Sequence, residues 1–129
     1  MKKILIIFVT AFVLNLVWEN LHSLLYDNYM GGKITEFILL RATLADAVMI
    51  VLITLPFVLI PLFKKYDWLI LPIGILVAIC IEWYALGTGR WAYNAYMPIV
   101  PIISVGLTPV LQLGLLGYLS FKIQEHINN

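Results

Sequence analysis

Residues 4–26 read ILIIFVTAFVLNLVWENLHSLLY, an apolar run that a few polar side chains interrupt. The run is long enough to cross the hydrocarbon core of a bilayer, which takes about 20 helical residues. Asn15, Glu19, His22 and Tyr26 follow the spacing i, i+4, i+7 and i+11. This spacing places their side chains on one face of a helix. The stretch therefore predicts a membrane-spanning helix that carries a polar stripe.

The composition of the whole chain indicates an integral membrane protein. Of its 129 residues, 63% are hydrophobic and 12% are charged, and the mean hydropathy is +0.99. Soluble domains carry about 25% charged residues. The net charge is +1 and no basic tract is present, so no nucleic-acid partner is expected. The single cysteine, Cys80, excludes an intrachain disulfide and is expected to be a small packing residue.

The apolar runs predict one all-α domain over residues 1–129, a four-transmembrane-helix bundle with short loops. The first run lacks the small residues of a signal-peptide cleavage site after its apolar core, so we expect an uncleaved first helix. No period-2 alternation typical of membrane strands is present. Pro101 and Pro109 are expected to interrupt the last helix, and Pro109 to kink it. The expected helices cover about residues 4–25, 36–63, 68–86 and 97–121.

The lysines and arginines predict the orientation of this bundle. Cytoplasmic loops of membrane proteins carry an excess of Lys and Arg. We therefore expect an integral protein of a prokaryotic cytoplasmic membrane, with both termini in the cytoplasm. The cytoplasmic side would hold Lys2, Lys3, Lys64, Lys65 and Lys122, and the outer side Lys33, Arg41 and Arg90.

Four ionisable residues inside the apolar runs form the candidate catalytic site: Glu19, His22, Asp46 and Glu82. Ionisable groups in a bilayer are costly and mark functional sites by default. The first helix ends outside, the second begins outside and the third ends outside. The four side chains are therefore expected at one depth near the outer leaflet, with Arg41 and Arg90 as charge partners.

The chemistry of these residues leaves three alternatives open. Glu19 and His22 have the Glu-x-x-His spacing used in di-iron helical bundles, and Asp46 and Glu82 could complete an oxygen and nitrogen metal site. Acid–base catalysis without a metal is the second alternative, because desolvation lets a carboxylic acid keep its proton near neutral pH. The third is a hydrogen-bonded network that only joins helices. The sequence requires no cofactor, and a divalent metal remains an open alternative.

Further polar and aromatic residues near the outer side are candidates for ligand binding. Ser104, Thr108 and Gln112 form a mild polar stripe on the last expected helix, although Ser and Thr often bond only to their own helix. Tryptophan and tyrosine also form belts at membrane interfaces. The glycines of the last helix are expected to permit close helix packing. The candidate ligand-binding residues are Asn15, Trp18, Arg41, Trp83, Arg90, Trp91, Tyr93, Asn94 and Gln112.

One loop gives a partial family resemblance. Gly89-Arg90-Trp91-Ala92-Tyr93-Asn94, followed by Pro101 and an apolar helix, resembles part of the small lycopene-cyclase-type membrane domains. In that family such a loop precedes a helix with a Pro-x-Glu-Glu motif. This chain has Pro109-Val110-Leu111-Gln112 near that place, without the paired acids. The resemblance implies an isoprenoid or other lipid-like ligand rather than cyclase activity.

The sequence thus favours a membrane-embedded enzyme or binding protein for a lipid-like or isoprenoid molecule. One alternative is a subunit of a proton- or ion-coupled transporter, in which the buried acids would relay protons. Another is a structural or assembly subunit whose polar network fixes helix packing. The expected partners are membrane lipid, a hydrophobic small-molecule ligand and further copies of the chain.

Overall fold

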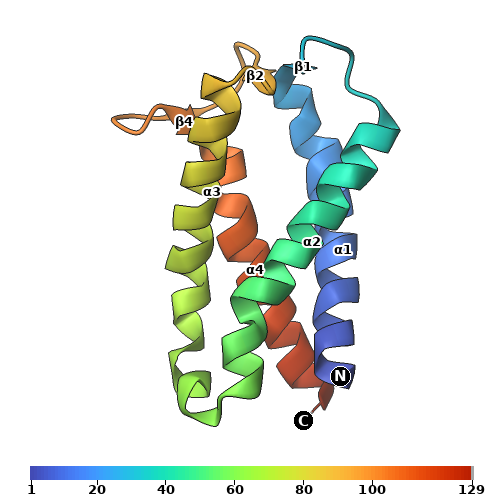
Figure 1. Ribbon diagram of the computed structural model, residues 1–129, viewed down its shortest axis with the longest axis vertical. Coiled ribbons are helices and arrows are strands. Elements are labelled where there is room, and N and C mark those ends of the chain that lie inside the picture. Colours follow the sequence, from blue (N-terminus) through green and yellow to red (C-terminus); the bar gives the residue numbers. More distant parts are fainter. Residues whose placement is uncertain (129) are drawn as a thin grey trace.

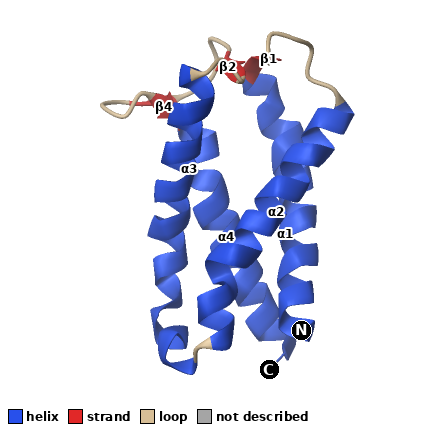
Figure 2. Ribbon diagram, viewed as in Figure 1, coloured by secondary structure: helices blue, strands red, loops and turns tan. Residues whose placement is uncertain are grey.

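Four long helices and two pairs of short strands make up the computed structural model, which describes residues 1–128 (Figures 1 and 2). Both termini lie at one end of the bundle, the terminal end. Strands β1 and β2 lie at the opposite end, called here the strand end. In chain order the elements are α1 (Lys2–His22), β1 (Tyr26–Tyr29), α2 (Glu36–Leu59), α3 (Ile70–Gly87), β2 (Trp91–Tyr93), β3 (Ile99–Val100), β4 (Val105–Gly106) and α4 (Leu107–Asn128), with short 3-10 helices over Ser23–Leu25 and Pro61–Leu69.

Local sequence signals explain where the helices begin and end. The Thr35 hydroxyl accepts a hydrogen bond from the Ile38 amide and caps the start of α2. Pro61 follows the end of α2 and opens the tight turn into α3. Pro56 lies within α2. Helices that span membranes tolerate such a proline, because neighbouring groups satisfy the backbone carbonyl that it leaves free.

Strands β1 and β2 join two segments that are far apart in the sequence. They pair antiparallel, with Tyr26 opposite Tyr93 and Tyr29 opposite Trp91. The pairing fastens the chain that leaves α1 to the chain that leaves α3. A second pair, β3 with β4, forms a small hairpin before α4.

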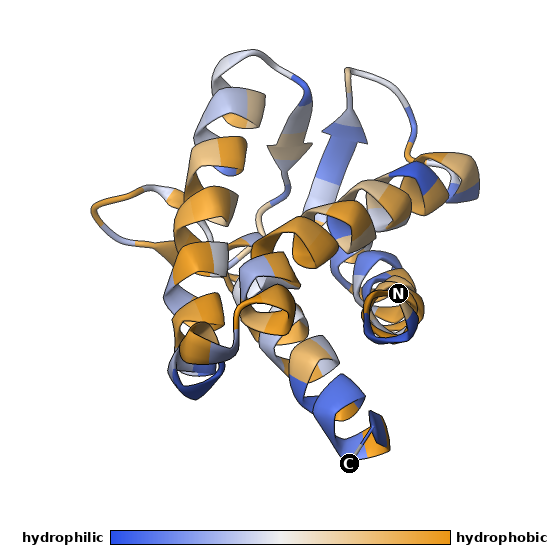
Figure 3. Ribbon diagram, turned by 60° about the horizontal axis from the view of Figure 1, so that its bottom comes forward, coloured by the Kyte–Doolittle hydropathy of each residue, from blue (hydrophilic) through white to orange (hydrophobic). Residues whose placement is uncertain are grey.

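The helices are apolar outside and polar inside at the strand end. Along α1 the side chains of Leu5, Val9, Val13, Val17 and Leu21 are all more than half exposed. On the opposite face Asn15, Glu19 and His22 are at most 8% exposed. Figure 3 shows apolar residues along all four helices. Three segments are long and apolar enough to cross a membrane, namely Lys2–Leu25, Glu36–Leu59 and Pro61–Gly87.

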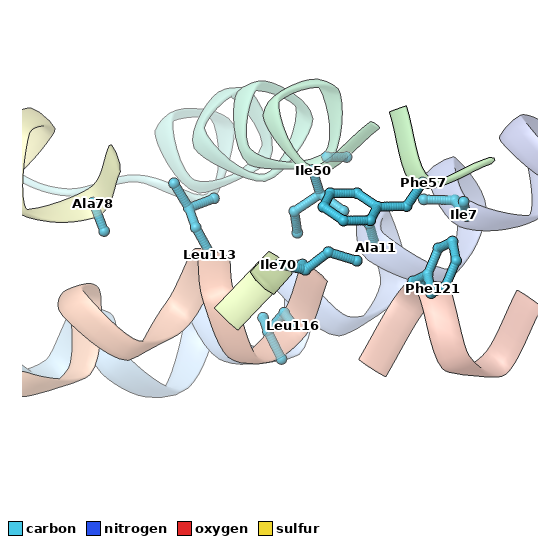
Figure 4. Packing of buried hydrophobic residues seen from close by; sticks show 10 residues of the cluster. Ile7, Ala11, Ile50, Phe57, Ile70, Ala78, Leu113, Leu116 and Phe121 are labelled. Carbon is cyan, nitrogen blue, oxygen red and sulfur yellow. The ribbon is translucent and has the colours of Figure 1, made fainter. Parts of the chain in front are cut away.

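Helix α4 is less apolar than the other three, yet it packs at the centre of the bundle. Its last two turns carry Lys122, Gln124, Glu125 and His126. Over its middle it contributes to the apolar core of the terminal half (Figure 4). The fully buried members of this core include Ile7, Ala11, Ile50, Ile70 and Phe121.

Glycines bring α3 and α4 into backbone contact, as expected from the glycine content of the last helix. A Cβ atom added at Gly74 would collide with the backbone of Gly114. A Cβ added at Gly114 would collide with the carbonyl of Leu71. Only glycine allows this approach, which resembles the small-residue packing typical of membrane helices.

The structure corrects several expectations about the last two helices. α4 begins at Leu107 rather than near Met97, because the intervening apolar residues form the β3–β4 hairpin. Pro109 therefore stands in the first turn of α4, where its missing N–H costs no helical hydrogen bond and causes no interruption. Ser104 lies outside α4 with a φ of 57° and does not continue the stripe of Thr108 and Gln112. Cys80, expected to pack inside, is exposed on α3.

Candidate functional site

A cavity of about 750 Å³ lies among the helices at the strand end. Its walls come from α1, β1, α2, α3, the loop after α3 and the start of α4. The four residues singled out as candidate catalytic groups, Glu19, His22, Asp46 and Glu82, all line it. Their side chains fall into two hydrogen-bond networks.

Gln112 of α4 holds the centre of the first network. Its Nε2 lies 2.9 Å from Oδ1 of Asn15 and 2.9 Å from Oε1 of Glu19, both on α1. The same nitrogen lies 2.8 Å from Oδ2 of Asp46 on α2. An amide nitrogen carries two hydrogens, so these three oxygens share two donated protons. One side chain thus connects α1, α2 and α4 at the depth of the cavity.

The carboxyl groups of Glu19 and Asp46 lie close together, because one oxygen of each lies within 2.9 Å of the same Gln112 nitrogen. On the other side of Glu19, its Oε2 lies 2.9 Å from Nε2 of His22. Thr108 Oγ1 lies 3.5 Å from Nδ1 of the same ring. The first network therefore places two carboxyl groups and an imidazole side by side.

Glu82 of α3 forms the centre of the second network and is 3% exposed. Its Oε1 accepts hydrogen bonds from the hydroxyls of Tyr93, at 2.6 Å, and Tyr26, at 3.1 Å. The indole Nε1 of Trp91 approaches the same oxygen at 3.4 Å. Within residues 1–128 no side chain donates to Oε2 of Glu82. Three donors thus fix the carboxyl group through one oxygen and leave the other available to a ligand.

The paired strands supply the donors of this second network. Tyr26 lies on β1, and Trp91 and Tyr93 lie on β2. The Tyr93 hydroxyl also accepts a hydrogen bond of 3.0 Å from the Gly106 amide, which ties β4 to the site. Burial raises the pKa of both phenols, and the neighbouring Glu82 raises it further. Both phenols therefore stay protonated and remain donors at neutral pH.

Aromatic contacts bring the two networks together. The rings of His22 and Tyr26 meet edge to face, with centroids 5.2 Å apart. Tyr26 in turn contacts the rings of Trp91 and Tyr93. His22 belongs to the first network and Tyr26 to the second, so the two networks border one continuous cavity wall.

The candidate ligand-binding residues divide into those that line the cavity and those that do not. Arg41, Arg90, Trp91 and Gln112 line it, and Asn15 and Tyr93 support it through the hydrogen bonds described above. The remaining three lie elsewhere. Trp83 is exposed and donates to the Ile103 carbonyl, Asn94 donates to the Leu24 carbonyl, and the indole nitrogen of Trp18 is buried with no partner among residues 1–128.

The arginines do not pair with the acids as expected. Among the described residues, neither the Arg41 nor the Arg90 side chain forms an ion pair with a carboxylate. The described residues do not form the metal site that was the first alternative either. Within residues 1–128, no group of three or more His, Cys, Asp or Glu side chains is arranged to hold a metal ion.

The sequence pattern missed the role of Tyr26. It was the last member of the polar stripe, one turn beyond His22, and that position could have indicated a site residue. Comparisons of the chain with protein-family models, with curated proteins and with solved structures find no match. Only the residues of the site itself therefore indicate its chemistry.

Proposed function

We propose that the chain spans a bilayer with all four helices and keeps both termini in the cytoplasm of a prokaryotic cell. The reversed polarity of α1 supports this proposal, because a soluble helix would expose Glu19 and bury Val13. Orientation rests on the positively charged terminal end. That end carries Lys2, Lys3, Lys64, Lys65 and Lys122, and the cavity then lies near the outer leaflet.

The function that the geometry supports best is binding of a lipid-like molecule in the cavity, with acid–base chemistry on it. The observation that carries this proposal is the cavity's outer edge. Leu44 and Val48 of α2 and Tyr84 of α3 line the cavity and are 48%, 44% and 63% exposed. The cavity therefore reaches the apolar outer surface between α2 and α3, where a lipid can enter sideways.

Polar groups at the inner side of the cavity would act on such a ligand. Oε2 of Glu82 faces no side-chain donor within residues 1–128, so it can exchange a proton with a ligand atom. Glu19 and Asp46 provide two further carboxyl groups that line the cavity. Trp91 provides an aromatic wall and belongs to the loop that resembles lycopene-cyclase-type domains. These features favour an isoprenoid or similar chain bearing one reactive polar end.

Two other functions are distinguished by particular observations. The neighbouring acids Glu19 and Asp46, which both contact Gln112, would suit a proton-coupled transporter subunit as relay groups. However, the apolar core around Ile50, Ile70 and Phe121 fills the half of the bundle near the terminal end. A single chain would thus need further copies to build a path across the membrane. A purely structural role is separated from both by the amide variants below.

The decisive experiment measures which lipids copurify with the full chain in mild detergent, by mass spectrometry. A variant that fills the cavity, Ala45→Phe, should lose a lipid that the wild type retains. Leu52→Phe changes an outward-facing residue of the same helix, away from this cavity, and should retain the lipid. Equal lipid content in both variants would contradict the proposed function.

Amide variants then separate chemistry from architecture. Glu82→Gln and Glu19→Gln keep size and polarity but remove the titratable proton. Hydrogen bonds between membrane helices average about 0.6 kcal/mol, so each variant should still fold. If the protein acts on its ligand, Glu82→Gln should accumulate the unreacted lipid at unchanged thermal stability. An unchanged cellular lipid profile in both variants would leave binding or a structural role.

A further inference from the structure

The cavity has two positive charges that no group within residues 1–128 neutralises by contact. Arg41 on α2 and Arg90, just after α3, both line it. Across residues 1–128, neither guanidinium makes a side-chain hydrogen bond or an ion pair. A guanidinium has five N–H donors in a planar fork and stays charged at any physiological pH. Two such groups at one cavity call for an acceptor from outside the chain.

The acids of the cavity do not fill this role, because none of them forms an ion pair with either guanidinium within residues 1–128. Glu19 contacts Gln112 and His22, and Asp46 contacts Gln112. Oε1 of Glu82 already takes the bonds from the strand-end aromatics. Glu19 and Glu82 are also more deeply buried than the arginines. Glu19 and Glu82 are at most 8% exposed, while Arg41 is exposed and Arg90 half-buried.

The chain order places the arginines nearer the membrane surface than the acids. Arg41 precedes Asp46 on α2, which begins at the strand end, and Arg90 follows Glu82 beyond the last residue of α3. Apolar residues, among them Leu44 and Val48, line the cavity where it reaches the surface of α2. A ligand with a charged head at the rim and an apolar chain along this wall matches both features.

We propose that the cavity ligand is a lipid with a phosphate headgroup, which Arg41 and Arg90 bind. This inference rests on the proposed lipid-binding function and adds the chemical class of the head. Phosphate oxygens match the guanidinium fork, and charge-assisted hydrogen bonds are about twice as strong as neutral ones. The deeper Glu82 carboxyl then faces the chain just beyond the head.

The test uses two probe lipids that differ only in the phosphate: dioleoyl phosphatidic acid and dioleoylglycerol. Binding to the full chain in dodecyl maltoside is measured by native mass spectrometry. Phosphatidic acid should bind about tenfold or more tightly than dioleoylglycerol, the size expected for one added charge-assisted contact. Glycerol 3-phosphate, the head without chains, should bind much more weakly than phosphatidic acid, because it leaves the apolar wall empty. Equally tight binding of glycerol 3-phosphate would assign the arginines to a free phosphate compound instead of a lipid.

Variants assign the preference to the two arginines. The double variant R41Q/R90Q should bind both lipids equally, and R41K/R90K should keep only part of the preference, because lysine lacks the fork. Lys33→Gln is the matched control. Like each single change R41Q or R90Q, it removes one unit charge from the same end of the bundle, but Lys33 is exposed and does not line the cavity. A preference for phosphatidic acid that survives in R41Q/R90Q, or that Lys33→Gln reduces equally, would overturn the proposal.

Failure of this inference differs from failure of the proposed function. If both lipids bind equally and Ala45→Phe abolishes both, the cavity binds lipid and only the headgroup assignment is wrong. If neither lipid binds, or Ala45→Phe leaves binding intact, the proposed lipid cavity itself is wrong. Thermal stability of each variant without lipid shows whether it is folded.

Discussion

The Tyr93 hydroxyl lies 2.6 Å from Oε1 of Glu82 and accepts a hydrogen bond from the Gly106 amide. One phenol thus connects β2, α3 and β4 at the strand end. Glu82 is buried on a segment that is long and apolar enough to cross a membrane, and its carboxyl group accepts hydrogen bonds from Tyr26, Trp91 and Tyr93, which lie outside that segment. The strand-end loops are therefore part of the site and not only connections between helices.

Replacing Tyr93 with phenylalanine should destabilise the protein more than replacing an exposed tyrosine. Tyr93→Phe removes the donor to Glu82 and the acceptor for Gly106, at a cost of about 1–2 kcal/mol. Tyr96 is 83% exposed and its hydroxyl has no partner among residues 1–128, so Tyr96→Phe is the control. Thermal unfolding in detergent measures both variants, and equal melting temperatures would contradict the described role of Tyr93.

Alkaline pH should weaken the same network. The folded-state pKa of Tyr26 and Tyr93 is raised above the ordinary value near 10, first by burial and then by Glu82. The folded state therefore binds their protons more tightly than the unfolded state does. This stabilisation is complete below about pH 10 and is lost as the pH rises toward the raised pKa.

The expected result is a melting temperature that falls above about pH 10, with a smaller fall in the Y26F/Y93F double variant. Y66F/Y96F, which changes two exposed tyrosines, serves as the control and should behave like the wild type. An identical alkaline fall in the wild type and in Y26F/Y93F would show that these phenols are not its source.

Hydropathy alone could predict α1, α2 and α3, because each is a long apolar run. It placed the end of the second helix at residue 63, whereas α2 ends at Leu59, before Pro61. It could not separate α4 from the residues before it. The segment from Met97 to Gly106 is mostly apolar, so hydropathy assigns it to the last helix. Pro98 and Pro101 favour turns, however, and the segment forms the β3–β4 hairpin. Weighing these prolines against hydropathy would have moved the predicted start of α4 toward Leu107.

The site was predictable where its residues share one helix and less so where they come from several. The i, i+4, i+7 spacing placed Asn15, Glu19 and His22 on one inward face, as observed. The sequence placed Gln112 in the polar stripe of the last helix and among the candidate ligand-binding residues. It did not show that Gln112 joins three helices, since that role depends on α1 and α2 meeting α4. The sequence did not predict the pairing of β1 with β2 either, because both strands are too short to show an alternation of polar and apolar residues.

Close packing of α3 on α4 should make Gly114 intolerant of alanine. The added methyl group would meet the Leu71 carbonyl, and the helices would have to separate, at a cost of about 1–3 kcal/mol. Gly74→Ala should behave in the same way, because it faces Gly114. At Gly87 an added Cβ meets nothing within 4 Å, so Gly87→Ala should be neutral or stabilising. Equal unfolding temperatures for Gly114→Ala and Gly87→Ala would rule out this contact.

The orientation can be tested with single cysteines in a Cys80→Ser background. Lys33 lies in the loop before α2 and Lys65 in the turn before α3, at opposite ends of the bundle. In intact cells, a membrane-impermeant maleimide should label Lys33→Cys from outside and should label Lys65→Cys only after the cells are opened. The reverse pattern would place the cavity near the inner leaflet.

Gln112 should be the most sensitive neutral position of the first network. Gln112→Leu removes hydrogen bonds to Asn15, Glu19 and Asp46, which at the values typical of membrane helices costs about 1–3 kcal/mol in all. Gln112→Glu should cost more, because it removes the same donors and adds a third carboxyl group beside two others.

A second change should restore the network if this explanation is right. In Q112E/D46N the amide moves to α2 and the carboxyl group to α4, so donors and acceptors are exchanged across the same contact. The double variant should recover at least half of the stability that Gln112→Glu loses, with Asp46→Asn alone completing the double-mutant cycle. Unfolding is followed by thermal denaturation in detergent at neutral pH. Additive losses in Q112E/D46N would mean that Gln112 and Asp46 do not interact, and the hydrogen bond between α2 and α4 would then not contribute to the fold.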